Sequence, residues 1–80
     1  MRRDYLPDLL YETLDELGGE ATALETAACF WTRHDTELRD SGNLFYTWRC
    51  DLRQAADTLR REHRMVEAYD CPEGVWALVQ

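Results

Sequence analysis

An apolar stripe in the second half of the sequence leaves few folds open to this chain. Between residues 44 and 64, apolar side chains recur at helical spacing, at Phe45, Trp48, Leu52, Ala55, Ala56 and Leu59. A 3.6-residue period sustained over about five turns predicts one long amphipathic helix with this face buried. A β-hairpin is predicted directly after it, at residues 65–79, because two short apolar arms flank a turn that contains Pro72 and Gly74. Trp76 and Leu78 of the second arm then point inward and close the core.

Two shorter helices are predicted upstream of this stripe. The first is capped by Asp4 and ended by Gly18 and Gly19. It carries leucines at helical spacing, at Leu6, Leu9, Leu10, Leu14 and Leu17. After a short extended segment, Thr22 and Glu25 form a capping box that opens the second helix. The apolar face of the second helix is predicted to be Leu24, Ala27, Ala28 and Trp31.

The segment between the second and third helices is predicted to be a loop. It runs from Arg33 to Asn43, it is polar, and it ends on turn residues. It has room for one helical turn around Leu38. The predicted order is therefore helix, short strand, helix, long helix and C-terminal hairpin, which is the order of the winged helix, an α+β fold.

Three sequence motifs carry a family resemblance. They are LDELGGEATALE, then Trp48-x3-Leu52-x6-Leu59, then MVE with GVW-x-L. Together they resemble the winged-helix domain found at the N-terminus of Mrr-type restriction endonucleases and in related prokaryotic DNA-binding proteins. The similarity covers nearly the whole chain, so we expect a single winged-helix domain over residues 1–80.

The resemblance implies that the third helix enters the major groove of DNA and that the hairpin is a wing that touches the DNA backbone. The chain departs from the family in two ways. We expect no nuclease domain after Gln80, and therefore no cleavage activity of the kind found in the family. The wing tip reads Asp70-Cys71-Pro72-Glu73, where phosphate contact requires Arg or Lys. We therefore expect Asp70 and Glu73 to stay off DNA or to face a basic protein surface.

Charge is distributed unevenly along the chain. Residues 45–64 hold five Arg against three acidic residues, a net charge of +2, whereas the other sixty residues hold four Arg against thirteen acidic residues, a net charge of −9. Arg reads guanine, Gln reads adenine, and Thr and Tyr bind phosphate, so this helix is a candidate DNA-contacting surface. Its candidate residues are Tyr46, Thr47, Arg49, Arg53, Gln54, Arg60, Arg61 and Arg64. The alternative is a solvated helix face whose Arg side chains pair with Asp57 and Glu62.

Composition indicates a small soluble protein. Eighty residues, 45% of them hydrophobic, suffice for one modest core. No apolar run approaches the roughly 18 residues of a membrane span, so we expect a cytoplasmic protein without a membrane partner. The three cysteines lack paired spacing, which favours reduced thiols. The net charge of −7, carried without any Lys, fits a DNA-mimicking surface, adaptation to high salt, or solubility.

Catalytic chemistry is not indicated by the sequence. Cys29 with His34, and Cys50 with His63, lack the four-ligand spacing of a zinc site, and no carboxylate pairs with a nucleophile. We expect no enzyme activity, no metal and no cofactor. Phe30 lies about 100° from the apolar face of the second helix, so it is a candidate surface aromatic for a partner protein. The alternative is a core residue under the loop at 33–43.

Three functions fit these observations. The first is a prokaryotic or phage transcriptional regulator that binds double-stranded DNA as a homodimer, because one small recognition helix rarely provides enough contacts. The second is a protein-binding winged helix, including a phage or mobile-element inhibitor whose acidic surface imitates DNA. The third is a subunit or domain of a restriction-like assembly. The positive helix favours the first, on analogy of fold.

Overall fold

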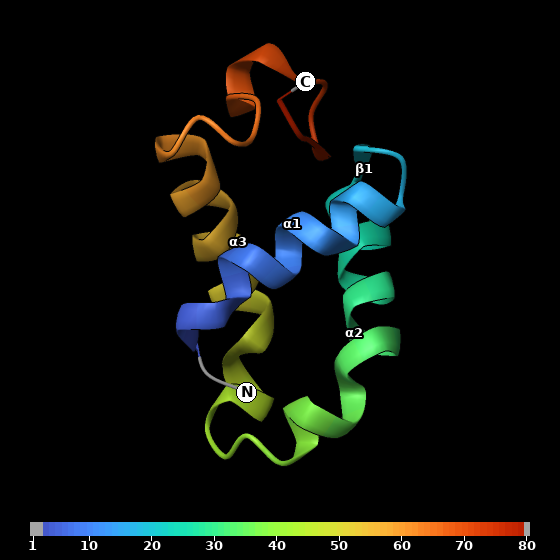
Figure 1. Ribbon diagram of the computed structural model, residues 1–80, viewed down its shortest axis with the longest axis vertical. Coiled ribbons are helices and arrows are strands. Elements are labelled where there is room, and N and C mark those ends of the chain that lie inside the picture. The colour runs from blue at the N-terminus through green and yellow to red at the C-terminus, as the bar shows by residue number, and fades with distance from the viewer. Residues whose placement is uncertain (1–2, 80) are drawn as a thin grey trace.

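The computed structural model describes residues 3–79 and has three helices and a small antiparallel sheet (Figure 1). A 3-10 turn at Arg3–Tyr5 leads into α1, Leu6–Glu16, followed by β1, Glu20–Thr22. Helices α2, Ala23–Arg39, and α3, Leu44–Arg61, come next. A second 3-10 turn, η2, Ala68–Asp70, precedes β2, Val75–Ala77. The α+β class and the order of the helices agree with the sequence prediction.

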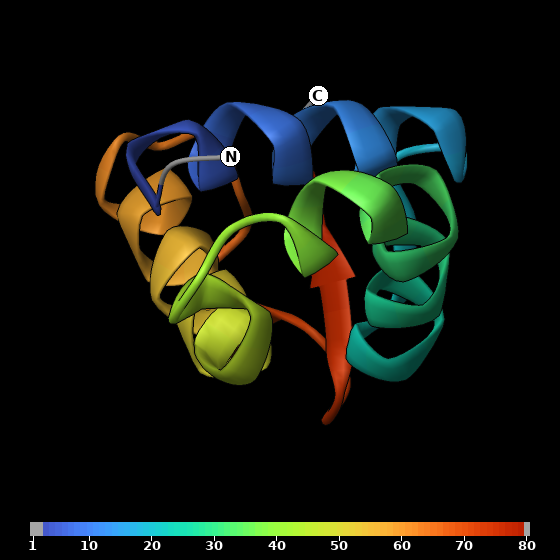
Figure 2. The ribbon, with the colours of Figure 1, turned by 90° about the horizontal axis from the view of Figure 1, so that it is seen from below.

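Helices α2 and α3 run in opposite directions and are joined by the short connection at 40–43 (Figure 1). Helix α1 crosses both of them on one side, as the view from below shows (Figure 2). The core lies between the three helices and β2. Its buried apolar residues are Leu6, Leu10, Leu14, Phe30, Leu38, Leu44, Trp48, Leu52, Ala55, Ala56, Leu59, Met65, Trp76 and Leu78. The predicted α3 stripe and the inward Trp76 and Leu78 are thus confirmed, except that Phe45 is only half-buried.

Strand β2 pairs with β1 in an antiparallel register that places Ala21 opposite Trp76. On its other side, the chain at β2 contacts the short segment 64–66. Met65 and Leu78 form an isolated antiparallel β-bridge, and the Val66 amide donates a hydrogen bond to the Ala77 carbonyl at 2.9 Å. The prediction of a regular hairpin over residues 65–79 is therefore wrong for its first arm, which does not form a continuous strand. The arm leaves the ladder after residue 66, because the backbone turns into η2, where the Asp70 amide donates to the Glu67 carbonyl.

The ends of α1 agree only in part with the sequence prediction. Gly18 and Gly19 end the helix as expected: both have positive φ, and the Gly19 amide donates to the Leu14 carbonyl at 2.8 Å. The Asp4 cap is wrong. The chain enters α1 through a 3-10 turn, Tyr5 is the N-cap residue, and no side chain caps it, because Asp4 lies inside that turn.

The capping box at the start of α2 is confirmed. The Thr22 hydroxyl accepts a hydrogen bond from the Glu25 amide at 3.0 Å, and the Glu25 carboxylate accepts one from the Thr22 amide at 3.1 Å. The Thr22 backbone amide first, and then the Thr22 hydroxyl, stabilise the ionised Glu25 carboxylate and hold the pKa of Glu25 below its usual value. The local sequence therefore fixes the point at which β1 gives way to α2.

Helix α2 is longer than predicted and buries a different face. It continues to Arg39, so the loop predicted at 33–43 shrinks to the connection at 40–43. From Ala23, where α2 begins, no Gly or Pro occurs until Gly42, which has a positive φ. The buried stripe, spaced by four residues, is Thr26, Phe30, His34 and Leu38. The predicted face is partly outside the core: Leu24 is 80% exposed and Ala28 is exposed, while Ala27 and Trp31 are half-buried.

Helix α3 ends three residues earlier than the predicted limit. His63 has a φ of 60°, and the Arg64 amide donates to the Leu59 carbonyl at 2.8 Å, which closes the helix end. Residues beyond Arg61 therefore no longer follow the helical period. Within residues 3–79, the helices are too short or too polar to cross a bilayer.

Candidate functional site

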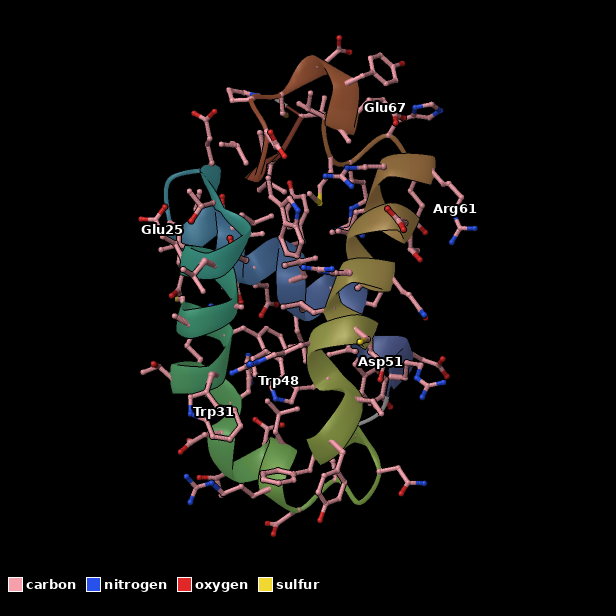
Figure 3. The ribbon with its side chains drawn as sticks, turned by 180° about the vertical axis from the view of Figure 1, so that it is seen from behind. Glu25, Trp31, Trp48, Asp51, Arg61 and Glu67 are labelled. Atoms are coloured by element: carbon pink, nitrogen blue, oxygen red, sulfur yellow. The ribbon has the colours of Figure 1, made fainter. Side chains whose placement is uncertain are left out.

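The outer face of α3 carries three cations that are free to contact a ligand. Arg49, Arg53 and Arg61 are exposed, and within residues 3–79 none of them lies within ion-pair distance of a carboxylate. Arg61 points away from the body of the protein (Figure 3), and its guanidinium donates to the Thr58 hydroxyl at 3.2 Å. Tyr46, one turn before Arg49, is 83% exposed. These four side chains form the outer α3 face discussed below.

Two other predicted DNA-contacting arginines are drawn into the protein. The Arg60 side chain is only 15% exposed; it donates to the Val66 carbonyl at 3.3 Å and pairs with Asp57 at 3.4 Å. Arg64 lies beyond the helix end, pairs with Asp8 at 3.2 Å, and sits over the Tyr11 ring at 4.4 Å. The structure therefore does not bring either of them to the outer α3 face. Arg60 ties α3 to the segment before β2, and Arg64 ties it to α1.

Thr47 and Gln54 lie on a different flank of α3, beside the N-terminal turn. The Thr47 hydroxyl donates to the Asp51 carboxylate at 2.7 Å, and Arg3 pairs with the same carboxylate at 3.2 Å. Gln54 lines a hollow there of about 310 Å³, together with Arg3 and Asp51. The sequence reading missed the role of Asp51, which is only 5% exposed and whose charge is satisfied inside this cluster. The spacing of four between Thr47 and Asp51 was the available signal.

A groove lies between α2 and α3. Its volume is about 460 Å³, and its lining residues are Ala23, Leu24, Ala27, Ala28, Trp31, Thr32, Trp48, Arg49, Leu52, Arg53 and Trp76. Trp48 lies between the two helices and Trp31 lies beside it over α2 (Figure 3), with ring centroids 5.7 Å apart and an interplanar angle of 19°. We call this hollow the tryptophan groove, because all three tryptophans of the chain line it.

The residues predicted to bind a partner protein separate into two groups. Phe30 is fully buried at 0% exposure, with its ring 6.0 Å from that of Trp48 and 4.7 Å from that of His34, so the expectation of a surface aromatic is wrong. It faces the core because α2 continues past residue 33 and places His34 and Leu38 on the same side. Asp70 and Glu73 are exposed at the turn before β2, and within residues 3–79 neither forms an ion pair.

Candidate metal ligands do not gather in the part of the chain that the structure describes. No group of three His, Cys, Asp or Glu side chains there is placed to hold a metal ion, and Cys29, Cys50 and Cys71 are free thiols. His34 is buried on α2: its Nδ1 lies 3.3 Å from the Glu37 carboxylate, and its Nε2 has no hydrogen-bond partner among these residues. The Phe30 ring packs against the imidazole, which makes His34 a member of the core.

Comparison of the chain with protein-family models, with curated proteins and with solved structures found no match. The features of the chain that bear on its function are the outer α3 face, the tryptophan groove and the acidic turn before β2.

Proposed function

We propose that this chain is a small winged-helix protein that binds double-stranded DNA with α3, as a transcriptional regulator of a prokaryote or phage does. The observation that carries the proposal is a set of three exposed arginines, Arg49, Arg53 and Arg61, which have no carboxylate partner within residues 3–79. They lie on one helix of an otherwise acidic protein. The order of the elements supports it, since β2 follows α3 and pairs with a short strand placed between the first two helices.

The contacts follow from the chemistry of the exposed groups. Arg49 and Arg53 are one helical turn apart, about 6 Å along the axis, which is close to the spacing of successive phosphates on one strand. Arg61 stands about two turns further along α3 and is rotated roughly 80° around the helix axis from Arg53, so it reaches a neighbouring part of the duplex. Each guanidinium neutralises a phosphate or reads a guanine bidentately, while the Tyr46 hydroxyl bonds a phosphate. A second copy on the same duplex doubles these contacts, which is why a homodimer is part of the proposal.

Removing one of the free arginines is expected to weaken DNA binding through the phosphate contacts. Arg49→Ala and Arg53→Ala should each reduce the slope of log K against log salt by about one. The measurement is the affinity for a mixed-sequence duplex over a salt series. Arg33→Ala is the matched control, because Arg33 pairs with Glu16 at 3.3 Å away from α3 and its loss changes the net charge equally. Slopes that fall equally in all three variants would show that net charge, and not α3, governs binding.

A second candidate function is binding to a basic protein surface through the turn before β2. The observation that favours it is the pair of exposed carboxylates at Asp70 and Glu73, which would repel phosphate within a Debye length of about 8 Å. Gly74 has a φ of 79° and makes the turn, so nearby substitutions that leave it intact preserve the backbone.

Reversing the charge of this turn separates the two functions. The double change Asp70→Arg and Glu73→Arg should tighten duplex binding. It should also steepen the slope of log K against log salt by about two, because two new phosphate contacts form. If the turn serves a basic protein, the variant gains at most weak, sequence-independent DNA affinity. A fall in DNA affinity would mean instead that the acidic turn contacts DNA directly, contrary to the proposal.

A further inference from the structure

The tryptophan groove has the shape and chemistry of a site for a helix. Along α2 it extends from Ala23 to Thr32, about 14 Å or two to three helical turns. Trp48 and Trp76 are 7% and 9% exposed and, with Leu52, form an apolar floor. Leu24, at 80% exposure, stands on the α2 rim, where a large apolar side chain gains free energy only when a partner covers it.

The two rims of the groove differ in charge. Arg49 and Arg53 line the α3 rim, and within residues 3–79 no carboxylate neutralises them. The Arg49 guanidinium lies 5.4 Å from the centroid of the Trp48 ring, over the apolar floor. The residues of the α2 rim, Leu24, Ala28 and Thr32, are uncharged. An occupant with an apolar centre and negative charge on one edge would therefore match the groove.

We infer that the tryptophan groove is the docking site for an amphipathic helix of a partner protein, with an apolar stripe and two acidic side chains one turn apart on one flank. The apolar stripe packs on Trp31, Trp48 and Trp76, as in other helix-in-groove complexes. The two carboxylates pair with Arg49 and Arg53, whose spacing of four residues matches that of Glu or Asp at positions i and i+4.

Other occupants fit less well. Two copies of this chain joined groove to groove would bring four arginines together without a carboxylate on the facing rim, which like-charge repulsion disfavours. DNA offers phosphates to Arg49 and Arg53, but apart from thymine methyl groups its surface is polar and gives Leu24 and Ala28 little apolar partner area. An acidic amphipathic helix pairs its carboxylates with the arginines of the α3 rim and packs its apolar stripe against the α2 rim.

Docking of a helix in the tryptophan groove would also regulate DNA binding. Arg49 and Arg53 also belong to the outer α3 face, so a docked acidic helix and duplex DNA would compete for them. This consequence rests on the proposed DNA binding, whereas the docking itself does not.

The test is a titration of the intact protein, without DNA, with synthetic helical peptides of about 16 residues. The probe peptide carries Leu at positions i, i+4 and i+7 and two Glu on one flank. Two comparison peptides have the same sequence with Gln or with Lys in place of both Glu. Tryptophan fluorescence reports binding, since every tryptophan of the chain lines the groove. We expect the Glu peptide to bind about fivefold more tightly than the Gln peptide, and the Lys peptide to bind most weakly.

Variants of the protein identify the site of binding. Ala28→Asp should weaken the Glu peptide at least about tenfold, because it places a charge against the apolar stripe. Thr36→Asp, also exposed on α2 but outside the groove, is the control and should leave the affinity unchanged. Arg49→Gln with Arg53→Gln should remove the preference for Glu over Gln while leaving a folded protein, as circular dichroism would record.

Three results would overturn the inference: equal affinity for the Glu, Gln and Lys peptides, binding unchanged by Ala28→Asp, or a protein dimer in sedimentation that Ala28→Asp dissociates. The last result would assign the groove to a second copy of this chain. Failure of DNA binding in the separate salt series would leave the peptide result standing, so the two proposals are tested independently.

Discussion

Trp48→Ala is expected to destabilise the protein by about 3–5 kcal/mol. The Trp48 ring stacks between two aromatic side chains of α2, with centroid distances of 6.0 Å to Phe30 and 5.7 Å to Trp31. Truncation removes both contacts and leaves a cavity between α2 and α3 that the helices cannot close without moving. A chain of 80 residues is stabilised by only about 4–12 kcal/mol in total, so the variant should be close to unfolding at 25 °C.

The measurement is urea unfolding followed by circular dichroism. Trp48→Phe keeps an aromatic ring at the site and should recover part of the loss, which gives a folded variant for comparison. Tyr46→Ala, on the same helix at 83% exposure, should change the free energy of unfolding by no more than about 0.5 kcal/mol. A cooperative, wild-type-like transition for Trp48→Ala would show that α2 and α3 do not pack through this ring.

Phe30→Ala is expected to cost about 3–5 kcal/mol as well. Phe30 is fully buried and touches both Trp48 and His34, so truncation would open the centre of the core. It would also remove the ring that covers the His34 imidazole, whose Nε2 is already without a hydrogen-bond partner within residues 3–79.

The matched control for Phe30 is Leu24→Ala, on the same helix at 80% exposure, which should shift the free energy of unfolding by no more than about 0.5 kcal/mol. Equal losses of unfolding free energy for the two substitutions would show that Phe30 is an exposed side chain and not a core residue. Because the Phe30 and Trp48 rings are in contact, the double variant should lose less than the sum of the two single losses.

The elements that the sequence predicted well are those with strong local signals. The α3 stripe is apolar and periodic over the whole helix, the two glycines after α1 both take positive φ, and Thr22 with Glu25 closes both bonds of the capping box. Each of these features is decided by neighbouring residues, so no knowledge of the tertiary structure was needed.

The features that the sequence did not predict depend on long-range packing. The buried stripe of α2 includes Thr26 and His34, which an apolar pattern cannot identify. The Thr26 hydroxyl is satisfied by the Thr22 carbonyl at 2.8 Å, so its burial is tolerated. The more apolar face, with Leu24 and Trp31, lines the tryptophan groove instead.

The arginines of the candidate site were also separated by tertiary structure. Helical period alone places Arg49, Arg53, Arg60 and Arg64 on one strip. The positive φ of His63 ends that period before Arg64, and the Val66 carbonyl captures the side chain of Arg60. Neither effect is visible in the spacing of residues, and both reduce the number of cations available to DNA.

The measurement that tests DNA binding by α3 most directly is a titration of isotope-labelled protein with a mixed-sequence duplex at low salt, followed by amide chemical shifts. The proposal predicts that the largest shifts centre on the outer α3 face, at Tyr46, Arg49, Arg53 and Arg61, with little change in α1. Shifts centred on α1 or on the turn from Asp70 to Gly74, or none at the lowest salt at which the protein stays folded, would contradict it.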